Sequence, residues 1–253
     1  MKDKASLKSL NSNFLFNLSL LSIHLNFFGS NIKAISFTGG TKTGAHIAKV
    51  AAPMFKKLSL ELGGKNPAII FSDCDYNEML QTTVRSSFAN QGQICLCGSR
   101  IFVEASLYQK FKTDFIAAVS KLKVGSPFNN DTDIGALVSR PHLEKVKMYI
   151  DNAAKYGGKV IFGGATVSVD NSEDGYYLEP TIIEVDDNSC ILNQDEIFGP
   201  VVTIMSFNDE NEVVAMANDV SYGLSATLWT NDLKRTMRVS KQIQAGIVWV
   251  NTW

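Results

Sequence analysis

The order of strand-like and helix-like segments constrains the fold more than any other feature of this sequence. Short apolar runs rich in β-branched and aromatic residues alternate with longer runs whose apolar residues recur every three or four positions. The predicted strands lie at 32–37, 57–62, 67–71, 99–103, 160–162, 181–185, 201–207, 225–230 and 246–250. The predicted helices lie at 43–51, 76–90, 107–122, 142–156, 212–218 and 233–243. Strands that alternate with helices form mostly parallel sheets with flanking helices, so we expect an α/β fold.

Composition narrows the classes of function. The chain has 253 residues, of which 45% are hydrophobic, and a net charge of −1 that offers no basic surface to nucleic acid. Four cysteines do not form a secreted disulfide framework in a chain of this length, and Cys95-Leu96-Cys97 has no second pair at zinc spacing. The histidines are scattered, and His142 is expected at the surface or as a helix cap. We therefore expect no metal, no nucleic acid partner and, since no apolar run is long enough to span a bilayer, no membrane partner. A reducing cytoplasm suits free thiols, and we expect the protein there.

The first 31 residues have no clean periodicity. Lys2, Lys4 and Lys8 precede an apolar run at 14–21, as in the charged and apolar regions of a secretory signal peptide. Polar residues interrupt that run, and no small-x-small cleavage site follows it. Two interpretations remain open, a targeting signal or a start that is not native to the rest of the chain. Residues 1–31 are left unassigned.

A carboxylate and a cysteine are the strongest candidates for chemistry. Glu61 precedes the Gly63-Gly64 turn, and Cys95 follows a predicted helix through a glycine. A thiolate is a strong nucleophile at neutral pH, and a carboxylate of suitable pKa can take a proton from water or from a thiol. Each residue alone has a simpler explanation, since a single cysteine is commonly a small buried hydrophobe and a glutamate beside glycines a solvated turn residue.

A second candidate is the pair Gly39 and Gly40, which follows a predicted strand and precedes a predicted helix. Free backbone N–H groups and the positive end of a helix dipole at such a turn suit the pyrophosphate of a nucleotide cofactor. The alternative is a tight strand-to-helix turn that needs glycine only for its backbone. The segment lacks the GxGxxG pattern of the common dinucleotide-binding turn.

Four motifs resemble those of the NAD(P)-dependent aldehyde dehydrogenase superfamily and stand in the same order. They are Phe37-Thr38-Gly39-Gly40-Thr41, Leu60-Glu61-Leu62-Gly63-Gly64-Lys65, Gly92-Gln93-Ile94-Cys95 and Glu196-Ile197-Phe198-Gly199-Pro200. The 34 positions from Glu61 to Cys95 also match the family pattern. The resemblance covers residues 32–253 and is greatest to members that act on semialdehydes.

The resemblance implies a role for each matched residue. Cys95 is the expected nucleophile, which adds to an aldehyde and passes through a thiohemiacetal and a thioester, and Glu61 is expected to activate the water that releases the acid. The expected cofactor is NAD. The expected cofactor-binding residues are Thr38, Gly39, Gly40, Leu62, Glu196 at the nicotinamide ribose and Phe198 in the nicotinamide pocket. Cys97 is expected to be a neighbour of the nucleophile, and Cys74 and Cys190 to be packing residues.

The resemblance also implies a domain division and an incomplete family fold. Residues 32–61 correspond to a remnant of the coenzyme-binding domain, and residues 62–253 to a catalytic domain truncated at its C-terminus. In the family, a Pro-Trp-Asn segment supplies an oxyanion donor and a lysine binds the adenine ribose; neither is present in residues 1–31. We therefore expect an aldehyde dehydrogenase-like fragment with an incomplete coenzyme domain and most of the catalytic domain.

The sequence leaves three candidate functions, which an experiment can distinguish. The first is oxidation of a small aldehyde, of a semialdehyde type such as 2-aminomuconic semialdehyde, to a carboxylic acid with NAD, in a family whose full-length members form homo-oligomers. The second is a catalytically inactive truncated subunit that only binds full-length partners. The third is a cofactor-free, thioesterase-like hydrolysis by Cys95 and Glu61. The first is favoured, and turnover that depends on NAD distinguishes it from the others.

Overall fold

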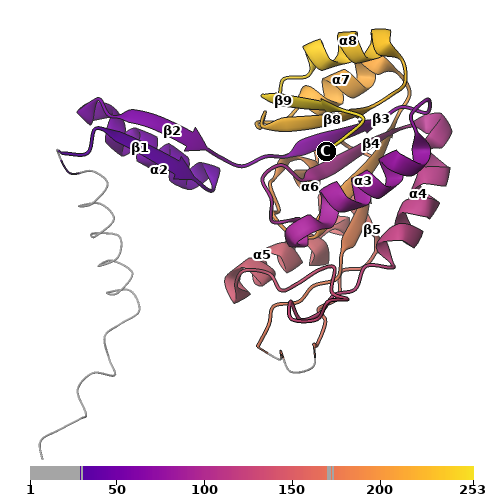
Figure 1. Cartoon of the computed structure of the whole chain (residues 1–253), viewed down its shortest axis with the longest axis horizontal. Helices are drawn as coiled ribbons and strands as arrows, with labels where there is room; N and C mark the ends of the chain where they lie inside the picture. The colour runs from indigo at the N-terminus through magenta and orange to yellow at the C-terminus, as the bar shows by residue number, and fades with distance from the viewer. Residues whose placement is uncertain (1–28, 30, 170–171, 173) are drawn as a thin grey trace, which may run out of the picture. The chain divides into compact units, whose positions relative to one another are not determined.

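The computed structural model describes residue 29, residues 31–169, residue 172 and residues 174–253. Backbone contacts divide the chain into two compact units, on either side of the bond between Gly63 and Gly64. Each unit is described by itself (Figure 1). The signal-like run at 14–21 lies outside the described residues.

The first unit is a β-α-β segment. Its elements are, in order, β1 (Ala34–Thr38), α2 (Thr41–Ala51), the 3₁₀ turn η1 (Ala52–Met54) and β2 (Lys57–Glu61). The two strands are parallel and end together, with Thr38 opposite Glu61. The helix packs tightly on the chain that leaves β2, because a Cβ added at Gly44 would lie 2.4 Å from Leu62 Cδ2. The ends of both strands and the start of the helix therefore form one compact edge.

The second unit is built on a seven-stranded sheet in the order β5-β6-β7-β4-β3-β8-β9. Its strands are β3 (Asn66–Ile70), β4 (Gly98–Glu104), β5 (Gly158–Phe162), β6 (Thr181–Val185), β7 (Val201–Phe207), β8 (Ser225–Trp229) and β9 (Ile247–Val250). Each neighbouring pair is parallel except β5 and β6, which are antiparallel. The α/β fold with a mostly parallel sheet is confirmed.

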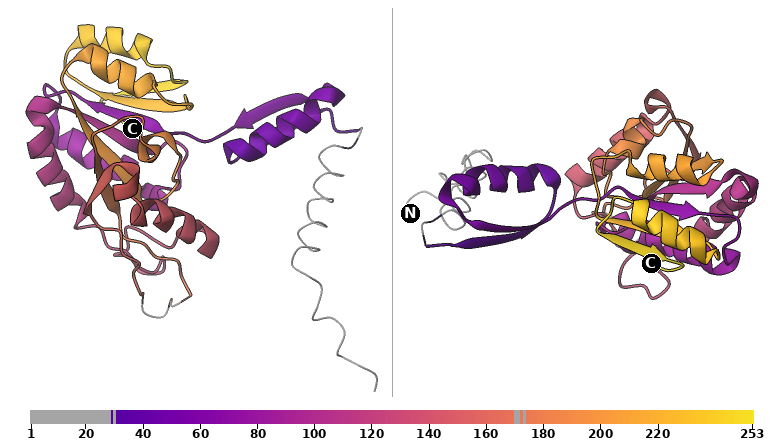
Figure 2. Two further views of the ribbon diagram at one scale, coloured as in Figure 1. Left: turned by 180° about the vertical axis from the view of Figure 1, so that it is seen from behind. Right: turned by 90° about the horizontal axis from the view of Figure 1, so that it is seen from above.

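Helices cover both faces of this sheet (Figures 1 and 2). They are α3 (Tyr76–Phe88), α4 (Ala105–Val119), α5 (Arg140–Asp151), α6 (Ile191–Gln194), α7 (Glu210–Asn218) and α8 (Leu233–Gln242), with 3₁₀ turns η2 (Ala89–Gly92) and η3 (Ala154–Tyr156). Along β3, Ala68 and Ile70 pack with α3 and α4, whereas Ile69 and the following Phe71 pack with α7 and α8. A central strand that is buried on both faces is mostly apolar, and β3 is apolar from Pro67 to Ile70.

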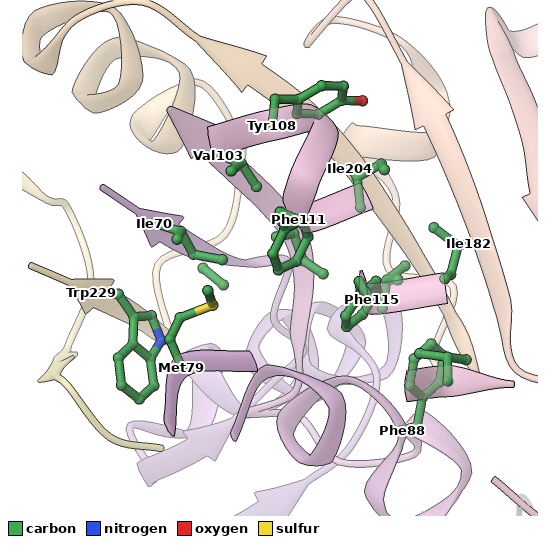
Figure 3. Close-up of a cluster of buried hydrophobic side chains, with 14 of the residues drawn as sticks. Ile70, Met79, Phe88, Val103, Tyr108, Phe111, Phe115, Ile182, Ile204 and Trp229 are labelled. Atoms are coloured by element: carbon green, nitrogen blue, oxygen red, sulfur yellow. The ribbon is translucent and has the colours of Figure 1, made fainter. Parts of the chain in front are cut away.

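An aromatic stripe on α4 forms much of the core on one face. Tyr108, Phe111 and Phe115 recur at intervals of three and four residues and point into the cluster drawn in Figure 3. The Phe111 and Phe115 rings stack with their centroids 5.0 Å apart, and Phe88 of α3 lies 6.2 Å from Phe115. The stripe packs the helix on the sheet, as predicted.

Two helical segments differ from the sequence prediction. The helix predicted at 142–156 ends at Asp151, because the side chain of Asn152 caps it by donating to the Met148 carbonyl at 2.8 Å. A separate 3₁₀ turn follows and closes at Gly157, whose φ of 82° favours glycine. The short helix α6 was not predicted, since four residues are too few for a helical period to be visible.

Candidate functional site

Cys95 lies on a tight turn between η2 and β4. The Cys97 N–H closes this turn by donating to the Ile94 carbonyl at 3.0 Å. The chain reaches it through left-handed backbone at Asn90, Gln91 and Gly92, with φ values of 49°, 57° and 67°. Gly92 is required there, since a Cβ would lie 2.1 Å from the Gly199 carbonyl oxygen. These three residues turn the chain sharply away from α3 and present Cys95, half-buried, at its tip.

Asn66 anchors the Cys95 turn to the sheet. Its Nδ2 donates to the carbonyl oxygens of Cys95 at 2.8 Å and Cys97 at 2.9 Å, and its Oδ1 accepts from the Ser225 N–H at 3.1 Å. The residue is 3% exposed, and its bonds to Cys97 and Ser225 are buried, whereas that to Cys95 is partly buried. Sequence reasoning did not identify Asn66. An asparagine at the start of an otherwise apolar strand is the signal that could have indicated it, because buried amides need partners.

Trp253 supports the same turn from the opposite end of the chain. Its Nε1–H donates to the Leu96 carbonyl at 2.9 Å. The ring lies edge-on to Trp249 with centroids 6.4 Å apart, and the Arg85 guanidinium lies 5.9 Å from its centroid. The two carbonyls of the turn at positions 95 and 96 are thus each held by a side chain distant in sequence.

Glu196 is linked to the Cys95 turn through Gly64. The Gly64 N–H donates to Glu196 Oε1 at 2.9 Å. Gly64 also contacts the turn so closely that a Cβ would lie 2.5 Å from the Cys95 carbonyl oxygen and 2.7 Å from Asn66 Oδ1. The second glycine of the Gly63-Gly64 pair therefore allows the close approach of three segments.

The segment that carries Glu196 and Phe198 is held from α5. Phe198 has left-handed backbone with φ 60°, and its carbonyl lies 2.6 Å from His142 Nε2. The two rings meet edge-on, with centroids 6.0 Å apart. Lys145 Nζ donates to the Glu196 carbonyl at 3.0 Å. His142 was predicted at the surface or as a helix cap. It is half-buried, the cap is Ser139, which accepts from the His142 N–H, and the His142 ring holds the Phe198 carbonyl, a role that the sequence did not indicate.

The other thiols differ from Cys95 in their surroundings. Cys97 is buried, and burial raises its pKa to about 11. Burial likewise raises the pKa of Cys74 to about 11. Cys74 and Cys190 pack against hydrophobic clusters of the second unit, as predicted. Both thiols with a raised pKa are protonated at neutral pH and are poor nucleophiles.

The remaining predicted site residues lie together in the first unit. The Gly39 N–H donates to the Glu61 carbonyl at 3.0 Å, and Glu61 and Thr38 are both exposed at the strand ends. Gly40 is the N-cap of α2, with open space around its Cα, and Leu62 packs on α2. The structure thus brings Thr38, Gly39, Gly40, Glu61 and Leu62 together in one unit. It brings Cys95, Glu196 and Phe198 together in the other.

Among the described residues, no group of three or more histidine, cysteine, aspartate or glutamate side chains could hold a metal ion. No helix of the described part of the chain is both long and apolar enough to cross a membrane.

Comparison with known proteins places these observations in a family. The model of the aldehyde dehydrogenase family matches residues 29–253. The chain is 50% identical over 226 residues to 2-aminomuconic semialdehyde dehydrogenase of Danio rerio and 47% identical to that of Homo sapiens, covering 88% of this chain and 46% of each relative. A crystal structure of betaine aldehyde dehydrogenase from Staphylococcus aureus in complex with NAD⁺ superposes with a TM-score of 0.86 and 39% identity, over 89% of this chain and 45% of that one.

The chain spans about half the length of the curated relatives it matches. The family predicted from the four motifs is confirmed by the match over nearly the whole chain, and the structural likeness is far above the level of a shared fold alone. The chain belongs to the aldehyde dehydrogenase family.

Proposed function

We propose that this chain carries the nucleophile of an enzyme that oxidises an aldehyde to a carboxylic acid with NAD. The observation that carries the proposal is the Cys95 turn, which a buried amide, a tryptophan N–H and a glycine contact hold in one conformation. A half-buried cysteine presented on such an anchored turn suits covalent catalysis, since a fixed nucleophile avoids the entropic cost of ordering during attack. The relatives named 2-aminomuconic semialdehyde dehydrogenase support a substrate of the semialdehyde type, such as 2-aminomuconic semialdehyde.

The chemistry assigned to the chain's own residues has two stages. The Cys95 thiolate adds to the aldehyde carbon and forms a thiohemiacetal, whose oxyanion needs a positioned donor, and the Cys95 N–H is a candidate. Loss of hydride from that carbon leaves a thioester on Cys95, and NAD, when bound, accepts the hydride. Glu61 then takes a proton from water as the water attacks the thioester, which releases the acid and regenerates the thiol.

The first unit fits the phosphates of NAD. α2 begins after Gly40 without a side-chain cap and without an acidic residue in its first turn. A Cβ at Gly40 would meet nothing within 4 Å, so the turn leaves room beside the helix N-terminus. Uncapped N–H groups and the positive end of the helix dipole favour an anion there. Thr38 and Gly39 would line this turn, and Leu62 would position it through its contact with α2.

The second unit fits the nicotinamide end. The Glu196 carboxylate accepts from the Gly64 N–H through one oxygen, and ribose hydroxyls are suitable donors to a carboxylate. The Phe198 ring is held beside it by the bond from its carbonyl to His142. We assign the ribose to Glu196 and the wall of the nicotinamide pocket to Phe198.

The remaining assignments follow from the family. Residues 32–61 are proposed as part of a coenzyme-binding domain and residues 62–253 as part of a catalytic domain. We propose a cytoplasmic protein, which suits a free nucleophilic thiol, and a homo-oligomer in the full-length form.

The test is capture of the covalent intermediate. The chain is incubated with NAD and a semialdehyde, quenched with acid, and mapped by peptide mass spectrometry, while NADH formation is followed in parallel. We expect the acyl group on the Cys95 peptide, no adduct in Cys95→Ser, and an unchanged adduct in the matched variant Cys97→Ser, which changes a buried thiol on the same turn. Glu61→Gln should increase the adduct, since hydrolysis of the thioester is slowed.

Three outcomes contradict the proposal. Acylation of Cys97 or Cys74 in place of Cys95 would show that the nucleophile is misassigned. Hydrolysis of an ester substrate without NAD that is lost in Cys95→Ser would favour the thioesterase-like function. Absence of both adduct and NADH, together with binding to a full-length relative, would favour the inactive subunit.

A further inference from the structure

Lys65 is a buried lysine whose amine has no hydrogen-bond partner in the described structure. It directly follows Gly64, precedes β3 and is 2% exposed. Within the part of the chain that the structure describes, the hydrogen bond of Lys65 is made by its carbonyl, which accepts from Arg100 Nε at 2.9 Å, and no hydrogen bond of its Nζ is found. Burial of an unpaired ammonium is costly, so a lysine is retained in such a place only where its charge or its amine interacts with something.

The Lys65 side chain lines a small cavity beneath the Cys95 turn. The cavity has a volume of about 20 Å³, room for about one water molecule. Its other polar walls are Ser87, Ser99 and Glu196. Ser99 Oγ is buried and has no hydrogen-bond partner in the described structure. The rest of the cavity wall is mostly apolar, so the Ser99 hydroxyl, the Lys65 amine and the Glu196 carboxylate are the groups that could bind a single water molecule and be joined by it.

The charges around Lys65 come from three segments. The Arg100 guanidinium, from β4, is fully buried. Each of its three nitrogens donates to one carbonyl, those of Lys65, Met216 and Ala217. From the segment that includes α6, Cys190, Asp195 and Glu196 face the lysine, and the Cys97 thiol lines the same cavity. Burial, and then the Arg100 charge, lower the pKa of Lys65 to about 7, while Cys190, Asp195 and Glu196 oppose this shift. The Asp195 and Glu196 carboxylates therefore favour the protonated, charged form of Lys65.

The Asp195 carboxylate already has a hydrogen bond. It accepts from the Tyr149 hydroxyl at 2.8 Å, which directs one of its oxygens to α5. Glu196, in contrast, lies in the cavity wall and is bonded to the residue directly before Lys65. Among these acids, Glu196 is the one that shares both a cavity and a backbone neighbour with the lysine.

We propose that Lys65 is a positioning residue for Glu196: its ammonium form, acting directly and through one water held against Ser99, keeps the Glu196 carboxylate on the Gly64 N–H. Loss of the proton from Lys65 removes this attraction and releases the carboxylate toward other donors. The bond between Glu196 and Gly64 then weakens as the pH rises through neutrality. This deepens the proposed function, because the carboxylate that Lys65 restrains is the one assigned to the cofactor ribose.

The test uses the whole chain and needs neither cofactor nor substrate. The protection of the Gly64 amide against hydrogen exchange is measured by NMR as a function of pH, corrected for the intrinsic rate. In the wild type we expect protection to fall as the pH rises through about 7. In Lys65→Met we expect the Gly64 amide to exchange about tenfold faster at pH 6, with no step near neutrality, because the isosteric apolar side chain cannot hold the carboxylate. Lys241→Met, the same substitution at an exposed position of α8, is the matched control and should behave as the wild type.

A second measurement separates positioning from simple packing. The titration of Lys65 is followed through its side-chain ¹³Cε signal in the wild type and in Glu196→Gln. Removal of the carboxylate should lower the pKa of Lys65, because an opposite charge favours the ammonium form. In Glu196→Gln, the further change Lys65→Met should leave Gly64 exchange unaltered.

The proposal is overturned by equal Gly64 protection in the wild type and Lys65→Met, or by a Lys65 titration that Glu196→Gln does not move. Failure of the proposed function has a different signature. In that case NAD and aldehyde produce no adduct on Cys95, while the Gly64 and Lys65 titrations remain as described.

Discussion

Replacement of Asn66 by alanine should free the Cys95 turn from the sheet. Two Asn66 donors hold the Cys95 and Cys97 carbonyls, and each such hydrogen bond contributes about 1 kcal/mol net to stability. Their loss reduces the free energy of local opening by about 2 kcal/mol, which increases the open population about 30-fold. The third bond, to the Ser225 N–H, adds to the loss of global stability, for a total of about 3 kcal/mol.

The assay is alkylation of Cys97, which is buried and reacts only when the turn opens. Iodoacetamide labelling of Cys97, quantified by peptide mass spectrometry under native conditions, should be about 30-fold faster in Asn66→Ala. Cys74, a half-buried thiol outside the turn, is the internal reference for global unfolding. Asn130→Ala, at an exposed position, should change neither rate. Cys97 labelling within about threefold of the wild-type rate, or equal acceleration at Cys74, would refute the reasoning.

Three further predictions concern the same region. Gly64→Ala should destabilise the chain by about 2 kcal/mol or more in urea unfolding, because the added Cβ would lie 2.5 Å from the Cys95 carbonyl oxygen. Gly40→Ala is the control and should unfold like the wild type, because a Cβ there meets nothing within 4 Å. Arg100→Met should destabilise the chain by about 2 to 3 kcal/mol in the same assay, since the buried Lys65 and Ala217 carbonyls lose the Arg100 donor and the Met216 carbonyl keeps only Asn188. NMR titration should show a higher pKa for Lys65 in this variant. The pKa of Lys65 is lower in the folded state than in the unfolded chain, so the unfolded state binds more protons between about pH 7 and 10.5. The free energy of unfolding should therefore rise with pH across this window, and it should rise more in the wild type than in Lys65→Met.

The sequence alone was sufficient for the fold class and for the identity of the family. Alternation of strand and helix patterns determines a parallel sheet because a central strand must be apolar on both faces and a covering helix on one. The strands at 181–185 and 201–207 were predicted at their observed bounds. Helix ends were less predictable, as at Asp151, where a side-chain cap that competes with continued helix decides the boundary.

The candidate nucleophile was also identifiable from the sequence, because Cys95 stands in a local motif with its glycine. The residues that hold Cys95 in place were not. Asn66 and Trp253 reach the turn from 29 and 157 positions away, and sequence spacing says nothing about contacts over such distances. Both side chains donate to backbone carbonyls, and every residue has one. The sequence of the turn therefore does not show which of its carbonyls is held.

Lys65 illustrates what tertiary structure alone decides. In the sequence it is one more residue of a glycine-containing motif, with the charge of any lysine. Only the packing of β3, β4 and the segment around α6 buries it beside Arg100 and places Glu196 in the same cavity wall. Residue type and spacing determine secondary structure and motif, whereas the charge state of a side chain depends on its distance from water and from other charges, and the folded chain sets both.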